Sequence, residues 1–591
     1  MSTFFWIFSL QDTLKLEPHR TEEDIMLTNF NPSFTFMKNR ILILWNNHID
    51  IFLFVLCAII TCVGCGANFL ALDKNLICSD EGWYLCLLRD CPHMDSATKF
   101  YLLFDNIFHN NIYAIRLFCW ALQIIGSIVF AIGLYTLLIQ YDHTRKRPYW
   151  LFLSFFAIYL GQMSIVDCPS LNYVTLNKII TEYAIGFFLI GLTKNKDFLI
   201  CLSGFFIAYL FPVMITNVII IPIMIVVLLL LSKNRHLQKT LFFLLGISLF
   251  ALYYFIFVES PKEVMSFLLD QSANTIKRGK QDYGILFLCA WLYQTGIYLL
   301  RCGIAAVLLY VCYQYGKHFK STRHQWKRWS WTLISSSIVL LYLWKYMQPT
   351  TPWLQYSSFP WLKDIIWIII FICIIDDVRN QRLLFSQRIL VAFFILVPIC
   401  LSFGSNVPFY VRGADYYLFL WPIILLMYQP RTPLLKTLIL LIISLQFLAF
   451  GYTCCKKNWY GDSFFRGEKI PVKTIGINQN LKLNKKYIEI LNFCKSNIPN
   501  GKILCSRCGW YIVDLLDYQP ISHEYNYALK DADSFSDLID DAIHQDGHLW
   551  VISDSESDYD FQAAIENIHN KNIQIIEYKD CKCYYITNKL Q

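Results

Sequence analysis

The sequence predicts a polytopic α-helical membrane protein that carries a C-terminal α/β domain. Of its 591 residues, 56% are hydrophobic and only 16% are charged, whereas soluble chains carry about 25% charged residues. Aromatic residues make up 17% of the chain, and amphipathic rings collect where helices cross a membrane–water boundary. This composition excludes a soluble single domain, an intrinsically disordered chain, a collagen-like fibre and a disulfide-stapled miniprotein.

Runs of about 17–25 apolar residues predict the membrane-spanning helices. The first span is expected near Ile49–Leu70. The others are expected near Ile112–Gln140, Tyr149–Met163, Lys178–Leu192, Phe198–Leu210, Phe211–Leu231, Thr240–Val258, Leu286–Tyr313, Trp331–Tyr346, Ile365–Ile375, Ile389–Phe403, Tyr416–Tyr428 and Leu434–Tyr452. Hydropathy thus predicts about thirteen helices. Several runs are shorter than a full crossing, so one or two could be merged, split or re-entrant.

Loop charges set the predicted orientation. Cytoplasmic loops of membrane proteins are enriched in Lys and Arg. If the N-terminus is cytoplasmic, basic groups such as Arg145-Lys146-Arg147 fall in cytoplasmic loops. The opposite short loops carry no Lys or Arg, around Cys168–Val174, Pro212–Asn217 and Gln348–Phe359. We therefore predict that the N-terminus lies inside and that the first loop lies on the outer face.

This topology divides the chain into three parts. Residues 1–40 form an N-terminal cytoplasmic segment, 41–453 the transmembrane domain, and 454–591 a soluble extracytoplasmic domain. The transmembrane domain contains a long first outer loop, 71–111. The sequence has no endoplasmic-reticulum retrieval signal, so we expect a multi-pass protein of a bacterial inner membrane.

The tail alternates helical and strand-like patterns, which predicts a small α/β domain. Helices are expected at Lys485–Ile498, Phe535–Ile543 and Tyr559–His569, and strands at Lys502–Cys505, His548–Ser553, Ile573–Tyr578 and Cys583–Ile586. The tail contains no glycine-rich phosphate loop, so the sequence does not support a nucleotide site.

Two cysteine pairs in the tail are candidates for a metal site. Cys505 and Cys508 form one pair, and Cys581 and Cys583 form the other. Four thiolates can hold a structural zinc ion, but on the oxidising side of a membrane we expect a disulfide or unpaired thiols instead. We predict no metal in the tail.

The first outer loop contains a pattern that could carry chemistry. It reads Ser79-Asp80-Glu81-Gly82-Trp83-Tyr84. One interpretation is structural: Ser79 or Asp80 caps a short interfacial helix, whose positive N-terminal end favours nearby carboxylates. The other interpretation is functional: a carboxylate at the membrane surface acts as general base toward a hydroxyl or amine acceptor.

This loop and the second span together resemble a known superfamily. The loop opens with Asp-Glu-x-x-Tyr, and Ile115-Arg116-Leu117 follows an aromatic stretch, Phe100–Phe104, which includes Tyr101. With an N-in first span, this layout resembles the GT-C superfamily of integral-membrane glycosyltransferases. It is similar to the bacterial lipid A aminoarabinose transferase, which also has an external α/β tail, and to the protein O-mannosyltransferases.

The resemblance implies an activity and a set of site residues. Such enzymes move a sugar from a polyprenyl-phosphate donor, here to a lipid, protein or glycan acceptor on the outer face, with inversion. The catalytic acid of the family's loop maps to Asp80, with Glu81 beside it. A second acidic position maps to Asp167, which equally fits the start of a turn before Pro169. The residues expected to bind the donor are Tyr84, Tyr101, Arg116, Lys277, Arg278 and Arg412.

Donor phosphate requires cations at the outer leaflet. Arg116 heads the second span, where a charge is costly unless it faces a polar cavity or snorkels to the interface. Residues 260–263 form a capping-box pattern that predicts an interfacial helix, which Lys277 and Arg278 follow. Arg412 lies in a late outer loop. Either donor phosphate or, without specificity, anionic lipid headgroups could bind these cations.

The expected partners are the polyprenyl-phosphate-linked sugar, the acceptor and the lipid bilayer, with no nucleic acid. We expect no cofactor, and dependence on a divalent metal stays open. One alternative is a polysaccharide or lipid transporter or flippase, which would show repeat-related halves and broken helices. Another is an enzyme like the O-antigen polymerases and ligases, which usually place their large loop late in the chain.

Overall fold

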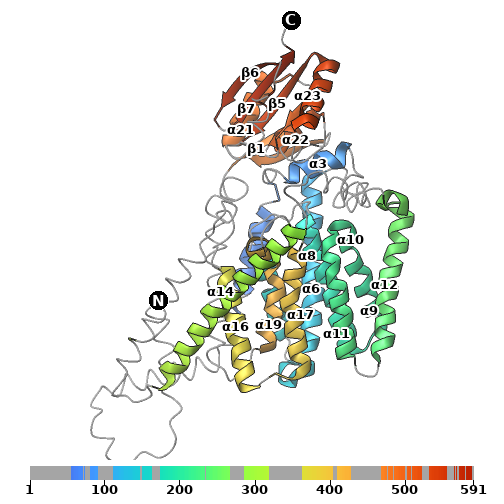
Figure 1. The fold of residues 1–591 in the computed structure, drawn as a ribbon, viewed down its shortest axis with the longest axis vertical. Helices are drawn as coiled ribbons and strands as arrows, with labels where there is room; N and C mark the ends of the chain where they lie inside the picture. Colours follow the sequence, from blue (N-terminus) through green and yellow to red (C-terminus); the bar gives the residue numbers. More distant parts are fainter. Residues whose placement is uncertain are drawn as a thin grey trace, which may run out of the picture.

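The computed structural model shows a bundle of helices with the C-terminal domain stacked on one end (Figure 1). The structure describes residues 55–56, 58–70, 72–73, 80–90, 111–146, 149–162, 173–232, 235–265, 285–318, 330, 362–381, 383–403, 409–427, 467–474, 477–483, 485–499, 502–506, 509–521, 532–554, 565, 568, 571–579 and 581–588. The spans predicted at Trp331–Tyr346 and Leu434–Tyr452 lie outside the described residues, apart from position 330 at the edge of the first.

The other apolar runs all coincide with helices. A first apolar helix covers Ala58–Leu70. The bundle continues with α6 (Ile112–Tyr141), α7 (Tyr149–Gln162), α8 (Tyr173–Lys194), α9 (Asp197–Ala208), α10 (Leu210–Val213), α11 (Ile220–Leu231), α12 (His236–Phe257), α14 (Ile285–His318), α16 (Leu362–Asn380), α17 (Phe385–Ser402), α18 (Phe409–Arg412) and α19 (Trp421–Met427). Short 3₁₀ helices lie between them: η2 (His143–Lys146), η3 (Ile215–Ile219) and η7 (Gly413–Leu420).

Length and composition identify the helices that can cross a membrane. Within the described residues, 5 helices are long and apolar enough to do so: α6, α8, α12, the Leu288–Cys312 part of α14, and α17. Large apolar side chains point outward on several of them, such as Phe257 of α12 (73% exposed) and Tyr293 of α14 (70%). A surface this apolar suits contact with lipid. These helices give a multi-pass arrangement, and the total of about thirteen spans stays a prediction.

Glycines let the backbones of neighbouring helices come into contact. A Cβ placed on Gly204 of α9 would lie 2.0 Å from the carbonyl oxygen of Phe243 on α12. Conversely, a Cβ on Gly246 of α12 would lie 1.9 Å from the carbonyl oxygen of Cys201 on α9. Small residues at such interfaces are the usual means by which membrane helices pack closely.

We therefore expect Gly246→Val to force α9 and α12 apart. Overpacking of this kind costs about 1–3 kcal/mol, and thermal unfolding of the protein in mild detergent measures the resulting loss of melting temperature. Gly296→Val on α14 is the matched control, because an added Cβ there meets nothing within 4 Å. Equal melting temperatures for the two variants would contradict the close approach of the helices.

The C-terminal domain is built on a mixed sheet of five strands in the order β4-β3-β5-β7-β6. The strands are β3 (Lys502–Cys505), β4 (Gln519–Pro520), β5 (His548–Asp554), β6 (Lys571–Tyr578) and β7 (Cys581–Asn588). β3 runs parallel to β4 and β5, whereas β7 is antiparallel to β5 and β6. The parallel strands follow from helices that cross over between them, as in other α/β units.

Three helices cover this sheet. α23 (Ala532–Asp546) packs on one face, against residues such as Val551 and Tyr584, while α21 (Lys485–Asn497) and α22 (Trp510–Leu515) share a core with residues of the opposite face. The predicted α/β tail is thereby confirmed, with most of its expected elements. The helix expected at Tyr559–His569 lies outside the described residues, apart from positions 565 and 568.

The structure adds elements that the sequence did not predict. A hairpin of β1 (Glu468–Thr474) and β2 (Ile477–Leu483) precedes α21, and α22 and β4 follow β3. Pro471 within β1 argues against a strand in the sequence, because proline donates no ladder hydrogen bond. The hairpin is a sheet of two strands, where an edge position tolerates proline.

Candidate site at the junction of bundle and tail

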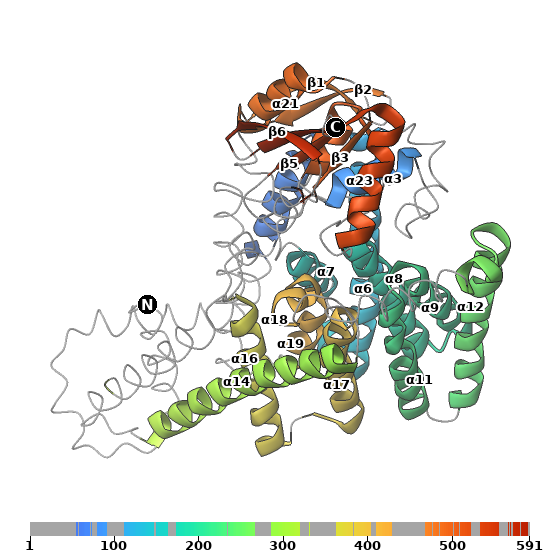
Figure 2. The ribbon, with the colours of Figure 1, turned by 45° about the horizontal axis from the view of Figure 1, so that its top comes forward.

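One helix of the loop that follows the first apolar helix lies between the bundle and the tail. This helix, α3, spans Asp80–Asp90; it lies beneath the C-terminal domain in Figure 1 and appears next to α23 in Figure 2. The short helix expected after Ser79 is therefore present. Asp80 and Glu81 form its first turn, and their side chains lie outside what the structure describes. The side chain of Tyr84 is buried.

Gly82 brings the backbone of α3 against the tail. A Cβ added at Gly82 would lie 2.9 Å from the backbone nitrogen of Tyr511 and 3.0 Å from its Cα, both in α22. Glycine is the residue that permits so close an approach of two backbones. Tyr511 is itself buried and packs edge-to-face on Tyr487 of α21, with ring centroids 5.0 Å apart. The position that follows the two acids of the loop is thus the contact point with the tail.

The start of the first loop is bound to the β1–β2 hairpin. The backbone N–H of Lys482 donates to the carbonyl oxygen of Asp73 at 2.6 Å. The Lys469 ammonium lies 3.0 Å from a carboxylate oxygen of Asp73. Because the Lys469 side chain is 66% exposed, this ion pair contributes little, in the range of about 0–1 kcal/mol. The backbone hydrogen bond is the firmer link between loop and tail.

Arg116 fixes the same segment from the side of the bundle. It is completely buried near the start of α6, and its Nη1 donates to the carbonyl oxygen of Leu72 at 3.0 Å. The helix itself begins at the N-cap Asn111, whose side chain accepts from the backbone N–H of Ala114. A buried guanidinium must be hydrogen-bonded, and here a backbone carbonyl serves this purpose. Donor binding by Arg116 stays a prediction.

Replacing Arg116 by methionine should therefore destabilise the anchoring of the loop. The carbonyl of the buried Leu72 would lose this donor, a change that costs about 1–3 kcal/mol. We expect a lower melting temperature and faster proteolysis of the 71–111 loop. Arg235→Met is the matched control, since Arg235 is exposed at the start of α12. A loop as resistant to protease in Arg116→Met as in the control would refute the anchoring role.

Further cations lie toward the junction end of the bundle. Arg412 donates from Nη2 to the hydroxyl of Tyr173 at 2.7 Å, and its guanidinium lies 5.5 Å from that ring's centroid. Tyr173 is the first residue of α8, and Lys178 is buried on the same helix. Lys178 lies about 7.5 Å further along the axis, at 1.5 Å per residue. The sequence predicted Arg412 as a donor-binding residue. Lys178 was not predicted to have a functional role and served only as the first residue of a predicted span.

Two buried acids inside the bundle were not identified from the sequence. Glu182 of α8 accepts from the Ser127 hydroxyl of α6 at 3.1 Å. Asp364 of α16 accepts from the Tyr298 hydroxyl of α14 at 2.7 Å. Each carboxylate links two helices, and ionisable groups in membrane spans are functional candidates by default. A single acid within an apolar run is the signal that would have found Glu182, whereas Asp364 stands beside Lys363 just before its run and has no such signal.

Four predicted site residues lie outside the described residues: Tyr101, Asp167, Lys277 and Arg278. The helix start that was expected ahead of the last two is present. The backbone N–H of Ser260 donates to the Glu263 carboxylate at 2.8 Å, and that of Glu263 donates to the Ser260 hydroxyl at 3.3 Å. This reciprocal pair is the predicted capping box. Of the predicted site residues, Tyr84 and the turn that carries Asp80 and Glu81 lie at the junction, all within α3.

Metal-ligating side chains converge elsewhere in the described part of the chain. The group consists of Cys494, Cys581 and Cys583, all buried in the tail. The sequence paired Cys581 with Cys583 and Cys505 with Cys508. The structure instead brings Cys494 to Cys581 and Cys583. This occurs because α21 covers the face of the sheet to which the side chains of Cys581 and Cys583 point. The expectation of no metal stays a prediction.

No protein-family model matches this sequence, and no curated protein matches it. Among solved structures, the chain is similar to the oligosaccharyltransferase of Archaeoglobus fulgidus, whose crystal structure contains an acceptor peptide tethered by a disulfide bond. The two chains are 11% identical, the TM-score is 0.45, and the similarity covers 93% of this chain and 75% of that chain. At this TM-score the similarity does not place the chain in a fold family.

Proposed function

We propose that this chain is an integral-membrane glycosyltransferase of the GT-C type. It would move a sugar from a polyprenyl-phosphate donor to a lipid, protein or glycan acceptor on the outer face of a bacterial inner membrane, with the N-terminus in the cytoplasm. The observation that carries the proposal is the position of α3, whose first turn holds Asp80 and Glu81. Arg116 contacts Leu72 and Lys482 contacts Asp73, both in the segment that precedes this turn. Gly82, within the turn, lies against Tyr511.

Such support is what general-base catalysis requires. A base accelerates proton transfer only when it is held at hydrogen-bond distance from the acceptor group. Positioning of the reacting groups contributes a large part of the rate of such transfers. A carboxylate on a loop attached only at its ends would lack this constraint, whereas the start of α3 lies against the tail at Gly82 and the chain before it is held by the bundle at Leu72.

The reaction would be a single displacement at the anomeric carbon. Asp80 takes the proton of the acceptor hydroxyl or amine, the acceptor atom forms a bond to that carbon, and the bond to the phosphate oxygen breaks. The polyprenyl phosphate leaves as an anion, and the anomeric configuration is inverted. Glu81 and Asp167 are the further acids that could assist. Cations that pair with the leaving phosphate stabilise the charge that develops on it.

The cations at the junction end are suited to this role. Arg412 is half-buried beside Tyr173, and Lys178 lies buried further along α8. Arg116 is close to the loop that carries the base, and Lys277 and Arg278 follow the capping box. Tyr84 and Tyr101 would line the path of the sugar or the lipid. The tail, in contact with α3 through α22, would cover the site and help to bind the acceptor.

A transporter is the second candidate, and the buried carboxylates favour it. Glu182 and Asp364 lie inside the bundle, and acids at such positions often belong to proton or ion pathways. A transporter would move the glycolipid without breaking its sugar–phosphate bond. An O-antigen polymerase-like or ligase-like enzyme would instead consume a donor with a lipid-linked chain of sugars.

Reconstituted full-length protein distinguishes these possibilities. Vesicles that contain the protein and a polyprenyl-phosphate sugar should release polyprenyl phosphate only when an acceptor is added. Mass spectrometry of glycolipids and surface glycans, with and without the gene, then names the sugar and the acceptor. Movement of intact glycolipid across the vesicle membrane without release of polyprenyl phosphate would contradict the transferase function and support the transporter function.

A further inference from the structure

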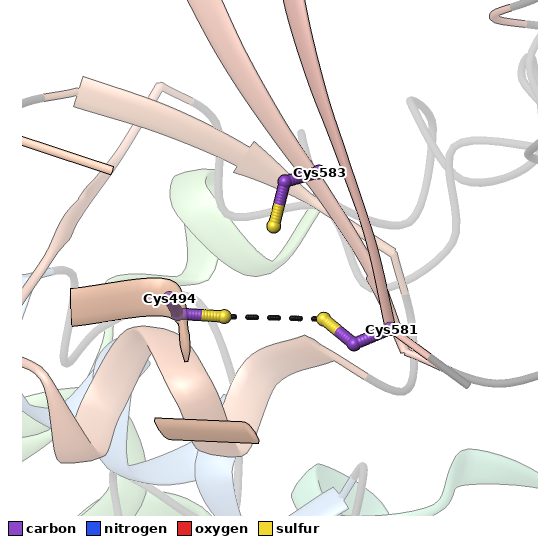
Figure 3. Close-up of side chains that lie close together, drawn as sticks. All are labelled: Cys494, Cys581 and Cys583. Atoms are coloured by element: carbon purple, nitrogen blue, oxygen red, sulfur yellow. Dashed lines mark hydrogen bonds between the residues drawn. The ribbon is translucent and has the colours of Figure 1, made fainter. Parts of the chain in front are cut away.

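Three cysteine side chains meet inside the C-terminal domain, away from the junction with the bundle. Figure 3 shows the sulfur of Cys494 directed at that of Cys581, with the sulfur of Cys583 beside them. All three residues are fully buried, and the three sulfur atoms lie within 4.8 Å of one another. The sulfur atoms of Cys494 and Cys581 are 3.9 Å apart. No part of the proposed transfer reaction uses them.

The fold fixes which sulfurs meet. Cys581 and Cys583 are two residues apart on β7, so their side chains point to the same face of the sheet. α21 covers this face and presents Cys494 one turn before its end. Phe493 stacks on Tyr578 of β6 with ring centroids 5.3 Å apart, which holds the end of α21 beside the β6–β7 turn.

A second contact holds α21 to the same turn. The ammonium of Lys579, between β6 and β7, donates to the carboxylate of Glu489. This contact holds the pKa of the Glu489 carboxyl below its usual range. The helix is therefore attached to the β6–β7 turn through Glu489 and Phe493, which precede Cys494, and this attachment keeps Cys494 beside β7.

The surroundings of the three thiols do not suit a metal ion. Zinc prefers four ligands, usually thiolates and imidazoles, and no described His, Asp or Glu side chain converges with these three sulfurs. A disulfide between two of these sulfurs, in contrast, carries no charge and needs no further ligand.

We propose that Cys494 and Cys581 form a disulfide in the mature protein, with Cys583 kept as a thiol beside it. The proposal rests on the outer-face location of the tail proposed above, but not on the transfer reaction. The two thiols lose two protons and two electrons as the sulfur–sulfur bond forms. A protein disulfide of an outer-compartment thiol oxidase accepts them and becomes a dithiol.

Cys581 and Cys583 are not expected to bond to each other. Two residues apart on a strand, their Cβ atoms are separated by about 6.6 Å at 3.3 Å per residue. A disulfide needs Cβ atoms about 3.5–4.5 Å apart. Cys494, which approaches from another element, is free of this restriction. The bond would join α21 to β7 and enclose most of the domain in one loop, which is the arrangement in which a disulfide stabilises most.

Peptide mapping of the full-length protein from membranes tests the pairing. The protein is denatured without reductant in the presence of N-ethylmaleimide, digested and examined by mass spectrometry. We expect a peptide pair linked through Cys494 and Cys581 that lacks two hydrogens, and Cys583 carrying the maleimide. Labelling of all three thiols, a link through Cys583, or bound zinc without a linked pair would each overturn the proposal.

Alanine variants provide the matched comparison. Reductant should lower the melting temperature of the natural protein by several degrees. This decrease should disappear in Cys494→Ala and Cys581→Ala and persist in Cys583→Ala, which removes the third sulfur of the same pocket. A decrease that persists in Cys494→Ala would refute the bond. Absence of transfer activity in the natural protein, with the linked peptide present, would refute the proposed function alone.

Discussion

Asp80→Asn is expected to reduce sugar transfer by about 10²–10⁴-fold, the usual contribution of a general base. Asparagine cannot accept the proton of the acceptor, but it starts a helix as well as aspartate does, so α3 should persist. The affinity for the polyprenyl-phosphate donor should change little, because the proposed mechanism assigns donor binding to cations rather than to this acid. The rate of polyprenyl phosphate release in vesicles, with donor and acceptor varied separately, measures both quantities.

The control for this variant comes from the same helix. Asp90 is the last residue of α3 and is exposed, so Asp90→Asn removes an equal charge from the other end of the helix. It should keep transfer close to that of the natural protein. If Asp80→Asn transfers sugar at the natural rate, Asp80 is not the base, and Glu81→Gln becomes the decisive variant.

Gly82→Val is expected to separate the tail from the first loop and thereby abolish most of the transfer. A Cβ at this position would meet backbone atoms of α22 at 2.9–3.0 Å, and backbone cannot swing aside as a side chain can. Overpacking costs about 1–3 kcal/mol, which changes the docking equilibrium by about 5–150-fold. The helices of the bundle should remain folded, because the three nearest atoms that the added Cβ would meet all belong to α22.

Two measurements separate loss of docking from general unfolding. Limited proteolysis should release the tail faster in Gly82→Val, while circular dichroism should show an unchanged helical bundle. Gly66→Val in the first apolar helix is the control, because an added Cβ there meets nothing within 4 Å. Natural rates of both proteolysis and transfer in Gly82→Val would show that the contact with α22 does not hold the site.

For the spans that the structure describes, the positions could be predicted from the sequence because each is a run of apolar residues, but their ends could not. α8 was expected to begin at Lys178 and in fact begins at Tyr173. Hydropathy treats polar residues as the end of a span, whereas here Asn177 is buried. With the Asn217 amide oriented to satisfy its neighbours, Asn177 donates to it at 2.9 Å.

The tail was predictable where its elements are long and regular. α21 and β3 lie where the amphipathic and apolar patterns placed them. α22 has only 6 residues, too few for a helical period to be visible. The strands of the hairpin are rich in Lys, Asn and Gln, residue types that do not predict β-strands. The two strands form because they pair with each other.

The site could be predicted only in part, because it depends on contacts between segments that are distant in sequence. The acids of the first loop and Arg116 were recognisable as residue types in a pattern. The contact of Gly82 with Tyr511, and the meeting of Cys494 with Cys581, have no local signal. The first contact forms when the folded tail packs on α3, and the second forms when α21 packs on its sheet.

The buried core that α3 shares with the tail has a practical consequence for anyone who would study the tail by itself. Leu85 of α3 and Trp510 of α22 belong to one buried cluster that continues into the membrane helices. A fragment that begins at the hairpin would expose to water the apolar side chains of α22 that pack on α3, and we expect it to self-associate. Ligand screens and crystallisation of this module therefore call for the intact chain in detergent or nanodiscs.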